Sequence, residues 1–191
     1  MEDCGVSGLY LLLALGIWTG LTALIVKVWR GQLAREDVSK RRVNAVFVPI
    51  LACWLGTTFW YGGGRKIYYD AQVNRMCRAD GGVRVYETVK LPTEKFDKWG
   101  NIRLPEKTQA KATDDFYYQA ETIYLRQGDP TIVRMHTQVI RRNDGKVLGE
   151  AIRYGRGGGD LPGPWHPSSF TCPDPTSKPY LEPSIFQKGE F

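Results

Sequence analysis

Two uncharged apolar stretches decide the architecture: CGVSGLYLLLALGIWTGLTALIV at residues 4–26 and VNAVFVPILACWLGTTFWYGGG at residues 43–64. Each stretch is long enough to cross a hydrocarbon core of about 30 Å as an α-helix. The rest of the 191-residue chain is mostly polar, and its length suits one globular domain. The sequence therefore predicts a transmembrane hairpin over residues 1–64, with helices at about 7–29 and 43–62, that carries a polar domain.

The loop between the two predicted helices, residues 30–42, is basic. It carries Lys and Arg side chains at five positions, whereas the segment before the first helix carries only Glu2 and Asp3. Short loops rich in Lys and Arg remain in the cytoplasm, and an acidic N-terminus lacks the positive region of a cleaved signal peptide. We therefore expect a two-pass protein of a bacterial inner membrane, with its N-terminus and its polar domain in the periplasm.

Small residues recur at four-residue spacing in both apolar stretches, as Gly16 and Gly20 in the first and as Ala52 and Gly56 in the second. This spacing lets helix backbones approach closely. The two grooves can face each other within the hairpin, or they can bind a partner helix. No acidic, basic or histidine residue lies in the middle of either stretch, which argues against a proton relay, a channel or a transporter.

Residues 65–160 predict an α+β domain, with an amphipathic helix over residues 65–78 and an alternating strand over residues 83–91. Asn143–Gly145 is a strong hairpin signal, because these residue types accept the backbone conformations of tight turns. The simplest assembly is one helix on a four-stranded antiparallel sheet. The last three predicted strands cover residues 116–126, 131–142 and 146–156.

Residues 161–191 are rich in proline and predict a C-terminal strap or tail without regular structure. Cys77 and Cys172 are the only cysteines outside the predicted hairpin. In an oxidising periplasm we expect a disulfide between them, which would join the predicted helix to the strap. In a cytoplasmic domain both residues would be free thiols.

The sequence contains no strong catalytic, cofactor or metal signature. His136 and His166 lack carboxylates at metal-ligand spacing, and no Ser or Cys lies in a nucleophile motif. Basic and acidic residues are interspersed, 26 against 20, which argues against a dedicated nucleic-acid surface. We therefore expect no cofactor, no metal and no nucleic-acid partner, and the sequence identifies no small-molecule substrate.

Aromatic and arginine side chains fall on neighbouring predicted strands. Such mixtures are typical of protein-binding surfaces and also of ordinary packed sheet faces. The candidates for an interaction surface are Tyr117, Tyr124, Arg134 and Tyr154.

Residues 77–92 read CRADGGVRVYETVKLP. This segment resembles one in uncharacterised, membrane-anchored bacterial proteins that share the pattern Cys-x-x-Asp-Gly-Gly-x-x-Val-Tyr-Glu-Thr-Val-x-Leu-Pro. The resemblance implies a bacterial source. It brings no known activity, and it therefore assigns no catalytic residue.

Three functions are compatible with these features. The leading hypothesis is a structural or accessory interaction module of a bacterial envelope complex, anchored by the hairpin and bound to a protein partner. The first alternative is an envelope enzyme that acts on peptidoglycan or lipid head groups through an acid such as Glu87 or Glu121. The second alternative is a mobile-element protein that blocks an envelope process such as phage entry.

Overall fold

The computed structural model of the chain describes residues 3–35, 39–161, 163, 166–176 and 179–189. Parts of the predicted basic loop and of the predicted strap lie outside the described residues. The chain divides into two compact units. The first comprises residues 1–66 and 159–167, and the second comprises residues 67–158 and 168–191.

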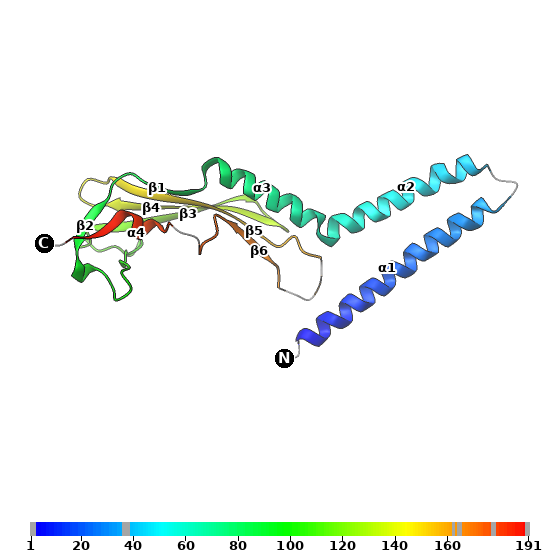
Figure 1. Cartoon of the computed structure of the whole chain (residues 1–191), viewed down its shortest axis with the longest axis horizontal. Helices are drawn as coiled ribbons and strands as arrows, with labels where there is room; N and C mark the ends of the chain where they lie inside the picture. The colour runs from blue at the N-terminus through cyan, green and yellow to red at the C-terminus, as the bar shows by residue number, and fades with distance from the viewer. Residues whose placement is uncertain (1–2, 36–38, 162, 164–165, 177–178, 190–191) are drawn as a thin grey trace. The chain divides into compact units, whose positions relative to one another are not determined.

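The first unit contains the apolar helices α1 (Asp3–Leu33) and α2 (Lys40–Phe59) (Figure 1). Among the described residues, two helices are long and apolar enough to cross a membrane, Gly8–Leu33 and Lys40–Asp80. The second of these is longer than predicted, because α2 continues through the π-helical turn η1 (Trp60–Gly64) into α3.

The sequence predicts a two-helix hairpin that is separate from a short domain helix. Up to Asp80, the described residues instead form three helices, α1, α2 and α3, and η1 joins the last two. The helix is kinked within Gly62–Gly64, where the backbone of Gly63 is not helical, although the N–H of Arg65 still donates to the carbonyl of Trp60, five residues earlier. Gly63 absorbs the local distortion with a φ of 156°. Glycine can adopt such a conformation because it has no Cβ.

Indole N–H groups join α1 to α2. Trp18 Nε1 donates to Thr58 Oγ1 at 3.1 Å, and Trp54 Nε1 donates to Thr22 Oγ1 at 3.0 Å. Bonds between helices of this kind satisfy polar groups where water is absent, as in the hydrocarbon of a membrane. A third indole bond, from Trp29 Nε1 to Asn44 Oδ1 at 3.0 Å, also joins the two helices, so tryptophan side chains donate all three of these bonds.

The predicted small-residue grooves do not make this contact. A Cβ added at Gly16, Gly20 or Gly56 would meet no atom within 4 Å, and Ala52 is exposed. The structure therefore does not bring the two grooves together.

The second unit is built on an antiparallel five-stranded sheet, in which β5 is paired on one side with β4 and on the other with β1 and β6. The strand β3 pairs with β4 and forms the end of the sheet on that side. A separate parallel pair joins β2 to β7. The elements are α3 (Arg65–Asp80), β1 (Gly82–Val85), β2 (Val89–Pro92), the 3-10 turn η2 (Thr93–Lys95), β3 (Phe116–Arg126), β4 (Thr131–Arg141), β5 (Val147–Gly157), β6 (Ser169–Cys172), α4 (Leu181–Ile185) and β7 (Phe186–Gly189).

The fold is α+β as predicted, but two details of the predicted sheet are wrong. The single strand predicted over residues 83–91 is broken, because the N–H groups of Tyr86 and Glu87 both donate to the carbonyl of Leu148. This break separates β1 from β2, and β1 pairs with β5 instead of continuing a meander. The predicted strap also contributes regular structure, since it supplies β6, α4 and β7.

The sheet buries apolar side chains on both faces. Under α3, Val73 and Cys77 contact Ile132, Ile152 and Tyr154. The opposite face is covered by the C-terminal segment, which adds a second cluster. The buried members of that cluster are Val139, Leu148, Ala151, Leu181, Ile185 and Phe186.

The predicted cysteine pair lies at disulfide-bonding distance. Cys77 of α3 and Cys172 of β6 form a disulfide with their Cα atoms 5.9 Å apart. Gly81 ends the helix beside this bond, and a Cβ there would lie 2.6 Å from the carbonyl oxygen of Cys77. Glycine is therefore required at this position.

Candidate functional site

The predicted interaction residues Arg134 and Tyr154 belong to a buried connection between α3 and the sheet. Tyr154 is only 5% exposed, and its hydroxyl donates to Asp80 Oδ1 at 2.7 Å. Arg134 Nε donates to the same hydroxyl at 3.2 Å. Burial, followed by the bond to Asp80, raises the pKa of Tyr154 above its usual value. Both side chains are therefore engaged in contacts within the fold, and part of the Arg134 side chain remains exposed.

Tyr117 and Tyr124 lie on opposite faces of β3, because their positions differ by an odd number in a regular strand. The guanidinium carbon of Arg142 lies 5.3 Å from the ring centre of Tyr117, in cation-π geometry. Tyr124 is 59% exposed. The structure thus places only Tyr124 on an open surface, and it does not assemble the four predicted residues into one site.

A hydrogen-bonded cluster that the sequence did not predict surrounds Glu150. Tyr86 donates its hydroxyl to Glu150 Oε1 at 2.5 Å, and His136 Nε2 lies 2.7 Å from Glu150 Oε2. Arg84 adds an ion pair at 3.4 Å. The bond from Tyr86, opposed by burial and assisted by His136, lowers the pKa of Glu150. Among the described residues no group of three or more His, Cys, Asp or Glu side chains could hold a metal ion.

Glu87, one of the two acids proposed for an envelope enzyme, is engaged in ion pairs. Lys146 Nζ lies 2.6 Å from Glu87 Oε2, and Arg141 bonds the other carboxylate oxygen. These partners lower the pKa of Glu87. A general acid needs a raised pKa at neutral pH, so neither Glu87 nor Glu150 has the environment of such a catalyst. Glu121, the other proposed acid, lies opposite His136 on an exposed stretch of β3.

The stability of the second unit should depend on pH through Glu150. Because its pKa is lower in the folded state, the carboxylate adds stability above its unfolded pKa, and this stability is lost as the pH falls through the folded pKa. We expect the free energy of unfolding to decline below about pH 5. In Glu150→Gln the decline should be smaller, and the variant should be about 1–3 kcal/mol less stable at pH 7.

Urea unfolding of the full chain at several pH values measures this effect. Glu94→Gln, which changes an exposed glutamate with no hydrogen bond in the described part of the chain, is the matched control. Glu87 also has a lowered pKa, so part of the acid sensitivity should survive in Glu150→Gln. An acid-induced loss identical to that of the wild type would show that Glu150 does not contribute.

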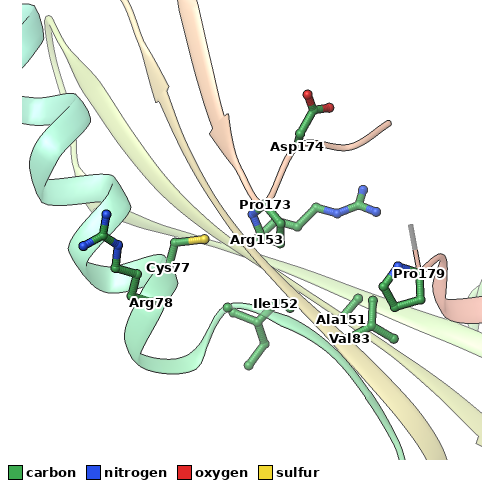
Figure 2. Close-up of a pocket in the computed structure, with 11 residues that line it drawn as sticks. Cys77, Arg78, Val83, Ala151, Ile152, Arg153, Pro173, Asp174 and Pro179 are labelled. Carbon is green, nitrogen blue, oxygen red and sulfur yellow. The ribbon is translucent and has the colours of Figure 1, made fainter. Parts of the chain in front are cut away.

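A cavity of about 310 Å³ lies beside the disulfide, within the size range of small-molecule sites. Its walls come from the end of α3, from β1, from β5 and from the segment after β6. Figure 2 shows the Arg153 side chain extending between Asp174 and Pro179, whereas the guanidinium of Arg78 points away from the other lining residues. The lining residues are Cys77, Arg78, Gly81, Gly82, Val83, Ala151, Ile152, Arg153, Pro173, Asp174 and Pro179.

The outer edge of β3 is covered at its beginning and open further on. Tyr118 donates its N–H to the carbonyl of Pro105 at 3.0 Å and accepts the N–H of Lys107 at 2.8 Å. Backbone groups alternate in direction along a strand, so every second residue after Tyr118 also directs its N–H and C=O away from β4. In the described part of the chain no strand pairs with these groups. The outward residues of the open edge are Ala120, Thr122 and Tyr124.

Apolar side chains are exposed along the same open edge. Ile123 is 39% exposed, Tyr124 is 59% exposed and Leu125 is 48% exposed. An edge strand with unpaired backbone groups and exposed apolar side chains is a template for pairing with another chain. Proteins block such edges with lysine, proline or a bulge, and residues 120–124 contain no lysine or proline. A register shift marks the end of this open stretch, between Tyr124 and Arg126.

The sequence predicts β3 as a strand, but it does not predict that β3 lies at the edge of the sheet. The alternation of residues 116–126 predicts a strand, whereas its place in the sheet depends on β1 pairing with β5. The Glu150 cluster was missed for a similar reason, because it depends on cross-strand register. The first signal available in the sequence is the hairpin at Asn143–Gly145, which makes β4 and β5 neighbours.

The Glu150 cluster, the cavity at Arg153 and the open edge of β3 can therefore be interpreted only from their own geometry. The first supports the fold, the second is a small concave site, and the third is an edge whose outward backbone groups pair with no strand in the described part of the chain. Comparison with protein-family models, with curated proteins and with solved structures finds no match to this chain.

Proposed function

We propose that this chain is a membrane-anchored accessory module of a bacterial envelope complex, which binds an extended segment of a partner protein along β3. The open outer edge of β3 carries the proposal. Ala120, Thr122 and Tyr124 offer three N–H donors and three C=O acceptors at the spacing of a strand. A partner segment in extended conformation would complete these hydrogen bonds, as in other cases of strand addition.

The side chains beside the edge define the chemistry of the partner segment. Ile123 lies on the same face as Glu121, while Thr122 and Tyr124 lie on the other face. A partner strand with apolar residues opposite Ile123 and Tyr124 would bury both exposed side chains. Burial of this kind, together with the backbone bonds, supplies affinity, and the alternating side chains supply specificity.

A second copy of the chain fits this edge less well than a different protein. Antiparallel pairing that used all three outward residues would place Thr122 opposite Thr122 of the copy. Arg126 of the copy would then lie opposite Tyr118, where residues 105–107 already occupy the outer side of β3. A partner segment that ends or bends before this point avoids the conflict.

The proposed location rests on two observations. The loop after α1 is rich in Lys and Arg, which favours the cytoplasm for that loop and the periplasm for the sheet domain. The Cys77–Cys172 disulfide is of a kind that persists in oxidising compartments. Alkylation of acid-quenched cells tests the location in a chain that carries Cys4→Ser and Cys53→Ser. In a periplasmic domain the disulfide protects Cys77 and Cys172 from alkylation until a reductant is added. In a cytoplasmic domain both thiols react without a reductant.

Partner binding should be detectable by crosslinking from the edge. We expect a photoreactive phenylalanine derivative at position 124 to give a discrete product with another membrane or periplasmic protein in living cells. The same derivative at Trp99, an aromatic residue that is 75% exposed, is the control position. Thr122→Pro should abolish the product, because it removes an outward N–H without breaking the ladder to β4. Thr122→Val keeps that N–H and should retain the product.

The crosslinking result separates the possible partners. The proposal is supported if position 124 gives a crosslinked product and position 99 gives none. The product must also be lost in Thr122→Pro and kept in Thr122→Val. A product with a second copy of the chain would replace the proposed partner by self-association. Equal products from both positions, or none from either, would contradict a binding role for the edge. An unchanged urea midpoint of Thr122→Pro shows that any loss does not reflect unfolding.

A further inference from the structure

Arg153 is a charged residue in the middle of a paired strand. It lies in β5, opposite Met135 of β4, and its side chain is half-buried. By alternation it shares a sheet face with Ala151 and Gly155, which offer no polar side chain. Among the described residues, its guanidinium forms neither a hydrogen bond nor an ion pair. A partly desolvated cation without a partner is unfavourable, and such positions are characteristic of functional sites.

The acids that line the two cavities at Arg153 do not supply the missing partner. Asp174 lines the same cavity, but it accepts the N–H of Thr176 at 2.8 Å and the hydroxyl of Thr176 at 2.7 Å. These two bonds lower the pKa of Asp174. Glu182 lines a neighbouring cavity that also reaches Arg153, yet it forms no ion pair with it in the described part of the chain. The turn at Asp174 therefore engages its carboxylate locally.

Two cavities meet at Arg153. The first, of about 310 Å³, is the one drawn in Figure 2, and the second, of about 150 Å³, shares Ala151 and Arg153 with it. Apart from Arg153, the first cavity is walled mainly by apolar groups. These groups come from Val83, Ala151, Ile152, Pro173, Pro179 and the Cys77 side of the disulfide.

We propose that this cavity binds a small monocarboxylate with an apolar body, with the carboxylate on the guanidinium of Arg153 and the body against the apolar wall. A guanidinium pairs a carboxylate through two parallel hydrogen bonds, which fits one arginine to one acid group. The negative charges of Asp174 and Glu182 at the cavity edges disfavour ligands with several negative charges, such as phosphates. The site is separate from the β3 edge, so it does not rest on the proposed function.

A matched pair of probes tests this assignment on the full chain in a neutral detergent. The first is 4-(trifluoromethyl)phenylacetate, and the second is its primary amide, which has the same body without the charge. Fluorine NMR follows the binding of each probe, and the wild-type chain should bind the acid about tenfold or more tightly than the amide. Since both probes partition into the same micelles, the difference between them reports on the protein.

Four variants locate the binding. Arg153→Gln should weaken acid binding at least about tenfold and leave amide binding unchanged, whereas Arg153→Lys should retain part of the preference. Arg75→Gln removes an exposed arginine of α3 and should change nothing. Pro179→Trp adds bulk at an exposed lining position, keeps Arg153, and should weaken both probes.

The proposal requires both the preference for the acid and its dependence on Arg153. Equal binding of acid and amide would overturn it, as would full acid binding by Arg153→Gln. Absence of saturation up to about 10 mM acid would also overturn it. The intact disulfide and an unchanged urea midpoint in each variant ensure that a loss of binding reports on the cavity and not on unfolding.

Discussion

Replacing Cys77 and Cys172 together by serine should lower the free energy of unfolding of the sheet domain by about 4–5 kcal/mol. The two cysteines are 95 residues apart in sequence, so their bond closes a long loop and removes much conformational freedom from the unfolded chain. Natural domains are stable by only about 5–15 kcal/mol, so this loss would bring the domain close to unfolding.

Pulse proteolysis in urea on the full chain in detergent measures this loss. The wild-type chain treated with a reductant should reproduce the midpoint of the double variant, because both lack the bond. Cys53→Ser, which changes an exposed free cysteine of α2, should leave the midpoint unchanged. If neither reduction nor substitution moves the midpoint, the bond makes no contribution to stability.

Asp70→Ala should have the second largest effect, with a loss of about 3–5 kcal/mol. Arg156 is only 2% exposed, and its Nε donates to Asp70 Oδ1 at 2.5 Å. Its remaining N–H groups reach the carbonyl of Gly158 and the side chain and carbonyl of Ser168. Removal of Asp70 would leave a buried positive charge with neutral acceptors only, and such a charge is strongly destabilising.

A double variant separates the uncompensated charge from a loss of packing. Asp70→Ala combined with Arg156→Met removes both charges and should recover part of the stability lost in Asp70→Ala alone. Arg75→Ala, at an exposed position of the same helix, is the control and should stay within about 0.5 kcal/mol of the wild type. The ion pair itself is not the important contact if the double variant loses more stability than the summed losses of the two single variants.

The sequence contained enough information to predict the three long strands and the cysteine pair. Alternating side chains and the turn at Asn143–Gly145 report on local structure, which a single sequence records directly. The break between β1 and β2 was not predictable in this way, because Val83, Val85, Val89 and Leu91 continue one alternating pattern across it. The break instead depends on a distant carbonyl, that of Leu148.

The Glu150 cluster shows why a site on a sheet can remain unpredicted even when its strands are assigned correctly. Beside the turn, Ile140 lies opposite Val147, and this register continued without change would put Glu150 and His136 on opposite faces. A one-residue shift after Ile140 brings Val139 opposite Gly149 and so places both side chains on one face. No pattern in the sequence predicts this shift in register, although the whole Glu150 cluster depends on it.

The covering of one sheet face by α4 has a consequence for the order of events during synthesis. Val139 and Leu148 are fully buried, and the cluster that covers them includes Leu181 and Ile185, which follow all five strands of the sheet in the sequence. The nascent sheet therefore displays an apolar face until α4 has been synthesised, in contrast to domains that mature from their N-terminus onward. Chaperones and proteases act on such exposed surface, so a chain released before α4 would be recognised as unfinished.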